Sequence, residues 1–264
     1  MVYEPNKIRT SEKQLEEIFK QLPGIPCLIG GWSVHQIVNK NFEKANGRKY
    51  IGSQDIDIGF NINKQWNEEQ LRKSEFAATI KTMESLGFES VGSRFVKNFD
   101  FDTGKELTPE ESKRLPMHQF FQIFIDLVVD YIHPEIEPLL GFVPIDEPLL
   151  SLVFQDKIYT VTTLFEKTVL LPKSHVLLAM KLNSAPNRDK ENKRIKDIAD
   201  IYALLWYSDI ALPQLKNQFF SIYPKEKARK IIQIFTKEDI NKVSTTIGIK
   251  TQEITRVLTE LTRF

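Results

Sequence analysis

The chain has 264 residues, of which 41% are hydrophobic and 27% charged, the balance of an ordinary folded protein with material for a core. Its single cysteine, Cys27, excludes an internal disulfide framework, and the apolar run around it favours a buried, inert thiol over a nucleophile. No apolar run approaches the roughly 18 residues of a membrane span, and residues 1–10 do not resemble a signal peptide. We therefore expect a cytoplasmic protein without membrane partners.

Charge is distributed unevenly along the chain. Residues 172–264 carry 17 Lys and Arg against 10 Asp and Glu, a net charge of +7, whereas residues 1–171 carry 19 against 25, a net of −6. An acidic part joined to a basic part favours a metal site on one side and an anionic ligand on the other, although solvated basic helices give the same totals. The glycine motifs of P-loop and dinucleotide-binding enzymes do not occur.

The first 60 residues predict alternating helices and strands. Helices are expected over 11–22 and 32–39, with a short buried strand over 27–29 and a glycine pair between that strand and the second helix. A polar, glycine-containing stretch over 41–49 follows. After it we expect the strand that carries Asp55 and Asp57 and ends around residue 60.

The middle of the chain predicts the rest of a sheet. A helix is expected over 68–86, strands over 88–91 and 94–99, and a polar loop over 100–117. The strand over 120–132 is the most strongly patterned. One of its faces is entirely apolar and the other carries Gln and Asp, which is typical of a central strand with one face near a site.

The predicted secondary structure changes from strands to helices towards the C-terminus. Residues 134–148 are proline-rich and irregular, and 149–161 predict two short strands. Helical patterns then follow one another over 174–183, 191–207, 212–222, 226–235, 237–246 and 251–261. The sequence thus predicts an α/β (α+β) domain with a mixed sheet over 1–171 and an all-helical domain over 172–264, with the active site in the cleft between them.

Asp55 and Asp57 are the leading candidates for chemistry. Side chains alternate between the faces of a strand, so residues two apart point the same way, here with like charges roughly 7 Å apart. A divalent cation between them would turn that repulsion into a binding site. An exposed edge strand with both carboxylates in water is the alternative.

Two further features flank this pair. Gly30-Gly31 lies between a strand and a helix, where glycine permits both a plain turn and the close approach of a phosphate to free N–H groups. Asp126 lies within an apolar strand, an unfavourable place for a charge without a partner. Beside the aspartate pair it would complete a three-carboxylate cluster for two Mg²⁺ ions, and Asp130 on the same face is the alternative third carboxylate.

In this order, LIGGWSVHQIV, GSQDIDIGF and IDLVVD resemble the motifs of the nucleotidyltransferase superfamily that includes DNA polymerase β and the antibiotic nucleotidyltransferases. Those motifs are a Gly-Gly or Gly-Ser turn, an Asp-x-Asp strand and a later single Asp. The basic stretch LLAMKLNSAPNRDKENKRIKDIADIYALL resembles the second half of AbiEii-type nucleotidyltransferases, the toxins of some bacterial toxin–antitoxin pairs. The interval between the glycine pair and the aspartate pair is longer than in the compact superfamily motif, and the comparison implies that 41–49 is an inserted loop.

The resemblance implies Mg²⁺-dependent transfer of a nucleoside monophosphate from an NTP to an acceptor hydroxyl, with release of pyrophosphate. It assigns metal binding and catalysis to Asp55, Asp57 and Asp126, and contact with the triphosphate to Lys181. It assigns phosphate or nucleotide binding to Gly30, Gly31, Ser33, Asp197 and Asp200 as well.

Surface positions are the alternative for the basic segment. Lys181 would then be a solvated helix lysine, and Asp197 and Asp200 would form pairs with Arg194 and Lys196 along one exposed helix. The sequence is compatible both with nucleotide binding and with these surface positions.

The acceptor is open too. The basic segment suits an RNA such as a tRNA end, because phosphate contacts dominate such binding, and it equally suits the NTP alone. The toxin resemblance implies a cognate antitoxin protein as partner. The alternatives are transfer to a small molecule such as an aminoglycoside, transfer to a protein, and a non-catalytic binding protein that keeps the fold.

Overall fold

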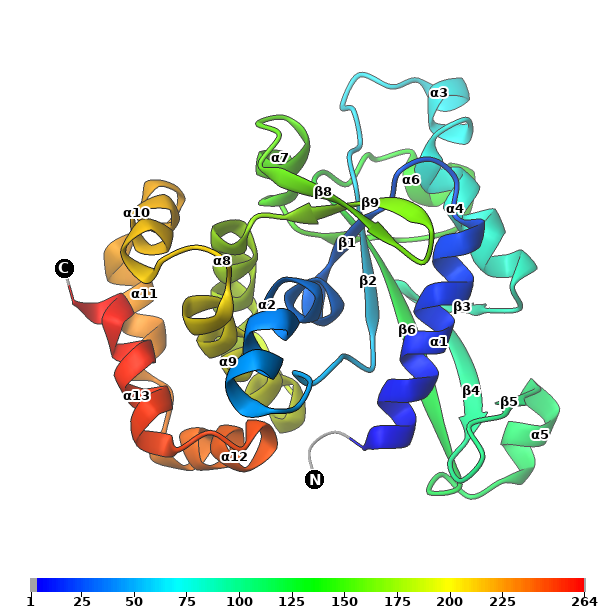
Figure 1. The fold of residues 1–264 in the computed structure, drawn as a ribbon. Coiled ribbons are helices and arrows are strands. Elements are labelled where there is room, and N and C mark those ends of the chain that lie inside the picture. The colour runs from blue at the N-terminus through cyan, green and yellow to red at the C-terminus, as the bar shows by residue number, and fades with distance from the viewer. Residues whose placement is uncertain (1–3, 264) are drawn as a thin grey trace. The chain divides into compact units, whose positions relative to one another are not determined.

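The computed structural model describes residues 4–263, which divide into two units (Figure 1). The sheet unit comprises residues 4–29 and 52–171, and the helical unit comprises residues 30–51 and 172–263. The predicted domains differ from these units in the segment 30–51, which groups with the C-terminal helices. None of the helices within residues 4–263 is long and apolar enough to cross a membrane.

The sheet unit is built on a mixed sheet, as predicted. Its strand order is β3-β4-β6-β2-β1-β9-β8, with β5 paired to β4 and β7 paired to β6. At its centre, β2 runs parallel to β6 and antiparallel to β1. The strands are β1 (Cys27–Ile29), β2 (Ile56–Phe60), β3 (Glu89–Val91), β4 (Arg94–Asp100), β5 (Glu106–Leu107), β6 (Phe120–Val129), β7 (Ile145–Asp146), β8 (Tyr159–Leu164) and β9 (Lys167–Pro172).

Hydrophobic alternation explains why β6 is central. Ile123, Ile125, Leu127 and Val129 are completely buried and share one face of the strand, as the pattern predicted. Helix α1 lies beside β6 (Figure 1). The helices of this unit are α1 (Pro5–Gln21), α3 (Glu68–Arg72), α4 (Glu75–Ser85), α5 (Pro109–Arg114), α6 (Ile136–Leu140) and α7 (Leu150–Phe154).

The helical unit contains α2 and the helices that follow β9. Within it, α2 packs on α8 and α9, and α9 also contacts α12 and α13. Apart from α2, these helices begin and end within a few residues of the predicted ranges. They are α2 (Gly30–Asn46), α8 (Ser174–Ser184), α9 (Glu191–Tyr207), α10 (Leu212–Ile222), α11 (Lys225–Gln233), α12 (Lys237–Ile247) and α13 (Thr251–Thr259), with short 3₁₀ turns at Ala185–Asn187 and Glu260–Thr262.

Several sequence predictions about local structure were wrong. The polar loop expected over 100–117 contains β5 and α5, and the helix expected over 11–22 already begins at Pro5. The inserted loop over 41–49 is largely helix, because α2 continues to Asn46 and buries Phe42 four residues after Val38. The single helix over 68–86 is two helices, since the Ser74 hydroxyl accepts a hydrogen bond from the Ala77 N–H and caps a new one. The first strand expected within 149–161 is the short helix α7.

Candidate functional site

Three charged side chains lie in one row across the centre of the sheet. Asp57 is directly opposite Asp126 in the parallel β2–β6 pair, and Asp126 is directly opposite Arg94 in the antiparallel β4–β6 pair. Residues in register share a face, and neighbouring strands are about 5 Å apart, so the three side chains project from the same side. Ile29, the last residue of β1, is opposite Asp57 on the other edge of the row.

The hydrophobic residues on either side of the aspartates fix this register. Ile56 and Ile58 flank Asp57, Ile125 and Leu127 flank Asp126, and all four of these apolar side chains are completely buried. A slip of one residue would exchange the faces, burying the carboxylate of Asp57 and moving the isoleucines to the other side. The apolar alternation therefore places the two aspartates side by side.

Arg94 is the partner of Asp126 in this row. Its Nη2 lies 2.7 Å from Asp126 Oδ2, with the aspartate side chain 8% exposed and that of the arginine 28% exposed. The guanidinium also lies over the ring of Phe124, 4.8 Å from the ring centre. Phe124 and Asp126 are two residues apart on β6 and therefore share a face. Asp126 pairs with the charge of the guanidinium, and the Phe124 ring packs against its flat face.

The other two candidate carboxylates are placed differently. Asp55 immediately precedes β2 and, like Asp57, is partly exposed. Asp130 follows β6, where its carboxylate accepts hydrogen bonds from the Ile62 backbone N–H at 2.8 Å and from the Asn61 side chain. Asp130 thus holds the chain that leaves β2, and Asp126 is the aspartate opposite Asp57.

A ready three-ligand metal site is not found in the described part of the chain. Among residues 4–263, no group of three or more His, Cys, Asp or Glu side chains is arranged to hold a metal ion. The predicted metal set of Asp55, Asp57 and Asp126 therefore stays a prediction. What the structure provides is two oxygen-bearing side chains in register and an arginine beside one of them.

The glycine pair lies at the end of β1, as predicted. Gly30 follows Ile29 directly and has a φ of +65°, a conformation that glycine adopts without strain. Gly31 and Ser33 are buried in the first turn of α2, and no hydrogen-bond partner of the Ser33 hydroxyl is found among the described residues. The sharp turn from strand to helix thus explains the need for glycine at position 30.

In the helical unit, a buried charge cluster joins α8 to α9. Lys181 Nζ lies 2.7 Å from Asp197 Oδ1 and 2.8 Å from Asp200 Oδ2, and Lys196 also bonds the Asp200 carboxylate. The relative exposures of these four residues are 7% for Lys181, 3% for Lys196, 1% for Asp197 and 0% for Asp200. The surface alternative is therefore wrong about exposure, because all four residues are buried, although the Lys196–Asp200 pair that it included does form. Buried charges of this kind need one another as partners.

Neighbouring polar groups complete the cluster. Ser184 donates to Asp197 Oδ2 at 2.9 Å, Arg188 Nε donates to the same oxygen at 2.7 Å, and the Tyr50 hydroxyl donates to Asp200 Oδ1 at 2.9 Å. Tyr50 comes from the segment after α2, so the cluster also ties that segment to α9. The cluster is an ion-pair core within the helical unit.

Opposing influences set the pKa values in this cluster. Burial lowers the pKa of Lys181, but the carboxylates of Asp197 and Asp200 outweigh it and raise the pKa above its ordinary value. For Lys196, burial and the charge of Lys181 prevail over Asp200, and the pKa is lowered. Burial raises the pKa of Asp197, but the positive charges of Lys181 and Arg188 lower it by more, and the pKa is about 2.

His35 of α2 is affected by the same cluster. Burial, followed by the positive charge of Lys196, lowers the pKa of His35 to about 4. Its ring packs edge-on against Trp32, with 5.4 Å between the ring centres. This histidine is therefore neutral at physiological pH.

Two residues of these clusters are not identified by the sequence. The sequence predicts Arg94 on a strand, but only the β4–β6 register shows that it faces Asp126. Tyr50 lies outside the predicted elements, and its bond to Asp200 joins residues 150 apart in the chain. Neither partner can be read from local spacing, although a lone aspartate in an apolar strand does indicate that a cation lies opposite it.

Comparisons with known proteins give limited information. No family model matches the chain. No curated protein matches it either. One solved structure that is similar to the chain is that of an antigenic nucleotidyltransferase-like protein from Paracoccidioides brasiliensis, with 15% identity over 93% of this chain and 94% of that one, and a TM-score of 0.42. The proposal of function therefore rests on the residues of this chain.

Proposed function

We propose that the chain is a nucleotidyltransferase that moves a nucleoside monophosphate from an NTP to an acceptor hydroxyl and releases pyrophosphate. The observation that carries this proposal is the register of Asp57 with Asp126, which sets two carboxylates side by side on one face of the sheet. The aspartate pair before and within β2, and the glycine turn after β1, support it.

Asp57 and Asp126, with Asp55, would hold Mg²⁺, because carboxylate oxygens are the ligands that this ion takes in proteins. Bound there, the ion would neutralise the charge of the triphosphate. Asp126 is the group proposed to accept the proton of the acceptor hydroxyl. Arg94 orients its carboxylate and offers a planar set of donors to phosphate oxygens.

The helical unit has a supporting part in the proposal. Gly30, Gly31 and Ser33 are proposed to bind phosphate through the first turn of α2. Lys181 is proposed to contact the triphosphate, and its ammonium would then have to leave one of the two carboxylates that it contacts. In the absence of nucleotide, Asp197 and Asp200 would keep the ammonium charged. The same contacts hold α8 and α9 together.

The acceptor proposed is an RNA such as a tRNA end. The net charge of +7 over residues 172–264 supports it, because Lys and Arg contacts with phosphates supply most of the affinity for RNA. In keeping with the AbiEii resemblance, we also propose a cognate antitoxin protein as partner and a cytoplasmic place of action. Small molecules and proteins are the competing acceptors.

The test is a screen with four labelled NTPs, Mg²⁺ and total RNA. We expect a labelled band of tRNA size with the wild type, and none with Asp57→Asn or Asp126→Asn. Asp156→Asn, which changes an exposed aspartate elsewhere in the sheet unit, should label as well as the wild type. Labelling of aminoglycosides alone, or of protein alone, would contradict the RNA acceptor and keep the transfer chemistry.

A non-catalytic binding protein is the second candidate function. The Arg94–Asp126 ion pair favours it, because a carboxylate bonded to an arginine is less available to a cation. This candidate predicts that no acceptor becomes labelled and that calorimetry detects neither Mg²⁺ nor NTP binding. That joint outcome would reject the transferase.

A further inference from the structure

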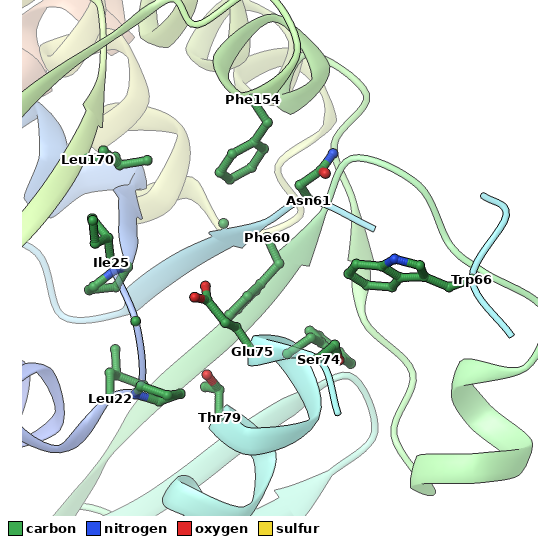
Figure 2. A pocket seen from close by; sticks show the side chains of 15 residues that line it. Leu22, Ile25, Phe60, Asn61, Trp66, Ser74, Glu75, Thr79, Phe154 and Leu170 are labelled. Atoms are coloured by element: carbon green, nitrogen blue, oxygen red, sulfur yellow. The ribbon is translucent and has the colours of Figure 1, made fainter. Parts of the chain in front are cut away.

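A second site lies within the sheet unit, at the end of β2. It is a cavity of about 470 Å³, in the range of small-molecule sites. Its walls are the segment 22–26, the end of β2 at Gly59 and Phe60, the start of α4, and Phe154 of α7 (Figure 2). None of Asp55, Asp57 and Asp126 lines it.

Aromatic side chains form much of the wall. Phe60 and Phe76 pack edge to face, with 5.3 Å between their ring centres, and Trp66 and Phe154 lie around the same space (Figure 2). Aromatic walls provide apolar contact area and, through their faces, attraction for a cation.

Glu75 is the only charged residue in this lining; no Lys, Arg or His contributes to it. Figure 2 shows its carboxylate between the segment Leu22–Ile25 and the aromatic side chains. A methyl group at Gly24 would come within 2.0 Å of Glu75 Oε1, so the carboxylate lies directly against a glycine backbone. Within residues 4–263, Glu75 forms no ion pair.

The start of α4 does not make this an anion site. Ser74 caps the helix by accepting from the Ala77 N–H, and the acidic Glu75 sits in the first turn, where it offsets the positive end of the helix dipole. In the same lining, the Asn61 amide oxygen accepts hydrogen bonds, and the Thr79 hydroxyl both accepts and donates them. The charge of the cavity is therefore negative.

We propose that this cavity binds a small organic cation, a protonated primary amine carried on an aromatic or similarly flat apolar body. The ammonium would pair with Glu75, and the apolar body would lie against Phe60, Trp66 and Phe154. Glu75 is exposed, so its carboxylate is accessible to a ligand that enters from solvent. An amine matches both parts of the lining at once, whereas a neutral ligand forms no ion pair with the carboxylate and an anion is repelled by it. The inference does not depend on nucleotidyl transfer.

Three matched probes test the proposal. The full ¹⁵N-labelled chain is titrated at pH 7 with 2-phenylethylamine, its neutral counterpart 2-phenylethanol and the anion phenylacetate, and the amides of residues 74–76 and the Trp66 indole N–H are followed by NMR. We expect saturable shifts with the amine, about five- to tenfold weaker binding of the alcohol, and no saturable shift with phenylacetate.

Two charge variants in α4 distinguish pairing of the amine with Glu75 from binding that does not involve this carboxylate. Glu75→Gln should bind the amine no more tightly than the alcohol, whereas Glu84→Gln, an exposed change outside the lining, should bind it as the wild type does. The amide spectra of both variants confirm that each is folded. Equal affinity for all three probes, equal amine affinity of the two variants, or no shift of these signals with any probe would overturn the proposal.

Discussion

Arg94 donates to Asp126 at 2.7 Å from the position directly opposite it in the antiparallel β4–β6 pair. The pair is local to the sheet although the two residues are 32 apart in the chain. It gives the buried carboxylate a cationic partner on the face it shares with Asp57.

Replacing this arginine should therefore destabilise the protein. We expect Arg94→Gln to lower the free energy of unfolding by about 1–3 kcal/mol, because a charged hydrogen bond to a mostly buried group is lost. Urea denaturation measures it, with Arg114→Gln, an exposed change at the end of α5, as control. Mg²⁺ should raise the melting temperature of Arg94→Gln more than that of the wild type; equal shifts would argue against a cation at Asp126.

The two aspartates of the 126–130 segment should behave differently. Asp130→Ala removes the acceptor of the Ile62 N–H, so we expect a loss of about 1–3 kcal/mol of stability and retained nucleotidyl transfer. Asp126→Asn should lose transfer. Transfer rates measured well below each melting temperature separate these effects, and a folded Asp130→Ala without activity would make Asp130 the third carboxylate.

The buried cluster makes a prediction about stability in the helical unit. Lys181→Met leaves Asp197 and Asp200 without their shared cation, and we expect about 3–5 kcal/mol of destabilisation. Lys190→Met, at an exposed position before α9, should change stability by only a few tenths. Chemical denaturation of both variants is the measurement. A Lys181→Met protein as stable as the control would show that the cluster does not stabilise the fold.

His35 makes stability depend on pH. Its pKa is lowered to about 4 in the folded protein, so the unfolded chain takes up a proton first as pH falls below the ordinary value near 6.5. The stability is thus fully present above about pH 6.5 and is lost as pH falls towards 4, by about 3 kcal/mol. Denaturation curves at several pH values should show this slope in the wild type and in His118→Asn, and a smaller slope in His35→Asn.

Local patterns predicted much of this fold. The alternation in residues 120–132 placed β6 and its buried face, and helical periodicity placed α9 and α10, because each pattern depends on neighbours within a few residues. Predicted helix boundaries were wrong where contacts between residues far apart in the chain determine them. Phe42 is an example, because its burial extends α2 through a polar stretch.

The candidate site was predictable in part. The sequence singled out Asp57 and Asp126, and the structure places them opposite each other. Arg94 and Tyr50 were missed because strand register and long-range contacts are not encoded in spacing. The surface interpretation of Asp197 failed for a similar reason: charges at helical spacing look alike whether water or other side chains surround them.

The two units are built from alternating segments of the chain, and this affects how the protein can be truncated. The polypeptide passes between them after residues 29, 51 and 171, so neither unit is one continuous stretch. A fragment truncated at residue 171 would retain α2 but lack α9, leaving the apolar side chains of Val34, Val38 and Phe42 uncovered. Such a fragment is expected to aggregate, so the carboxylate row is best studied in the intact polypeptide.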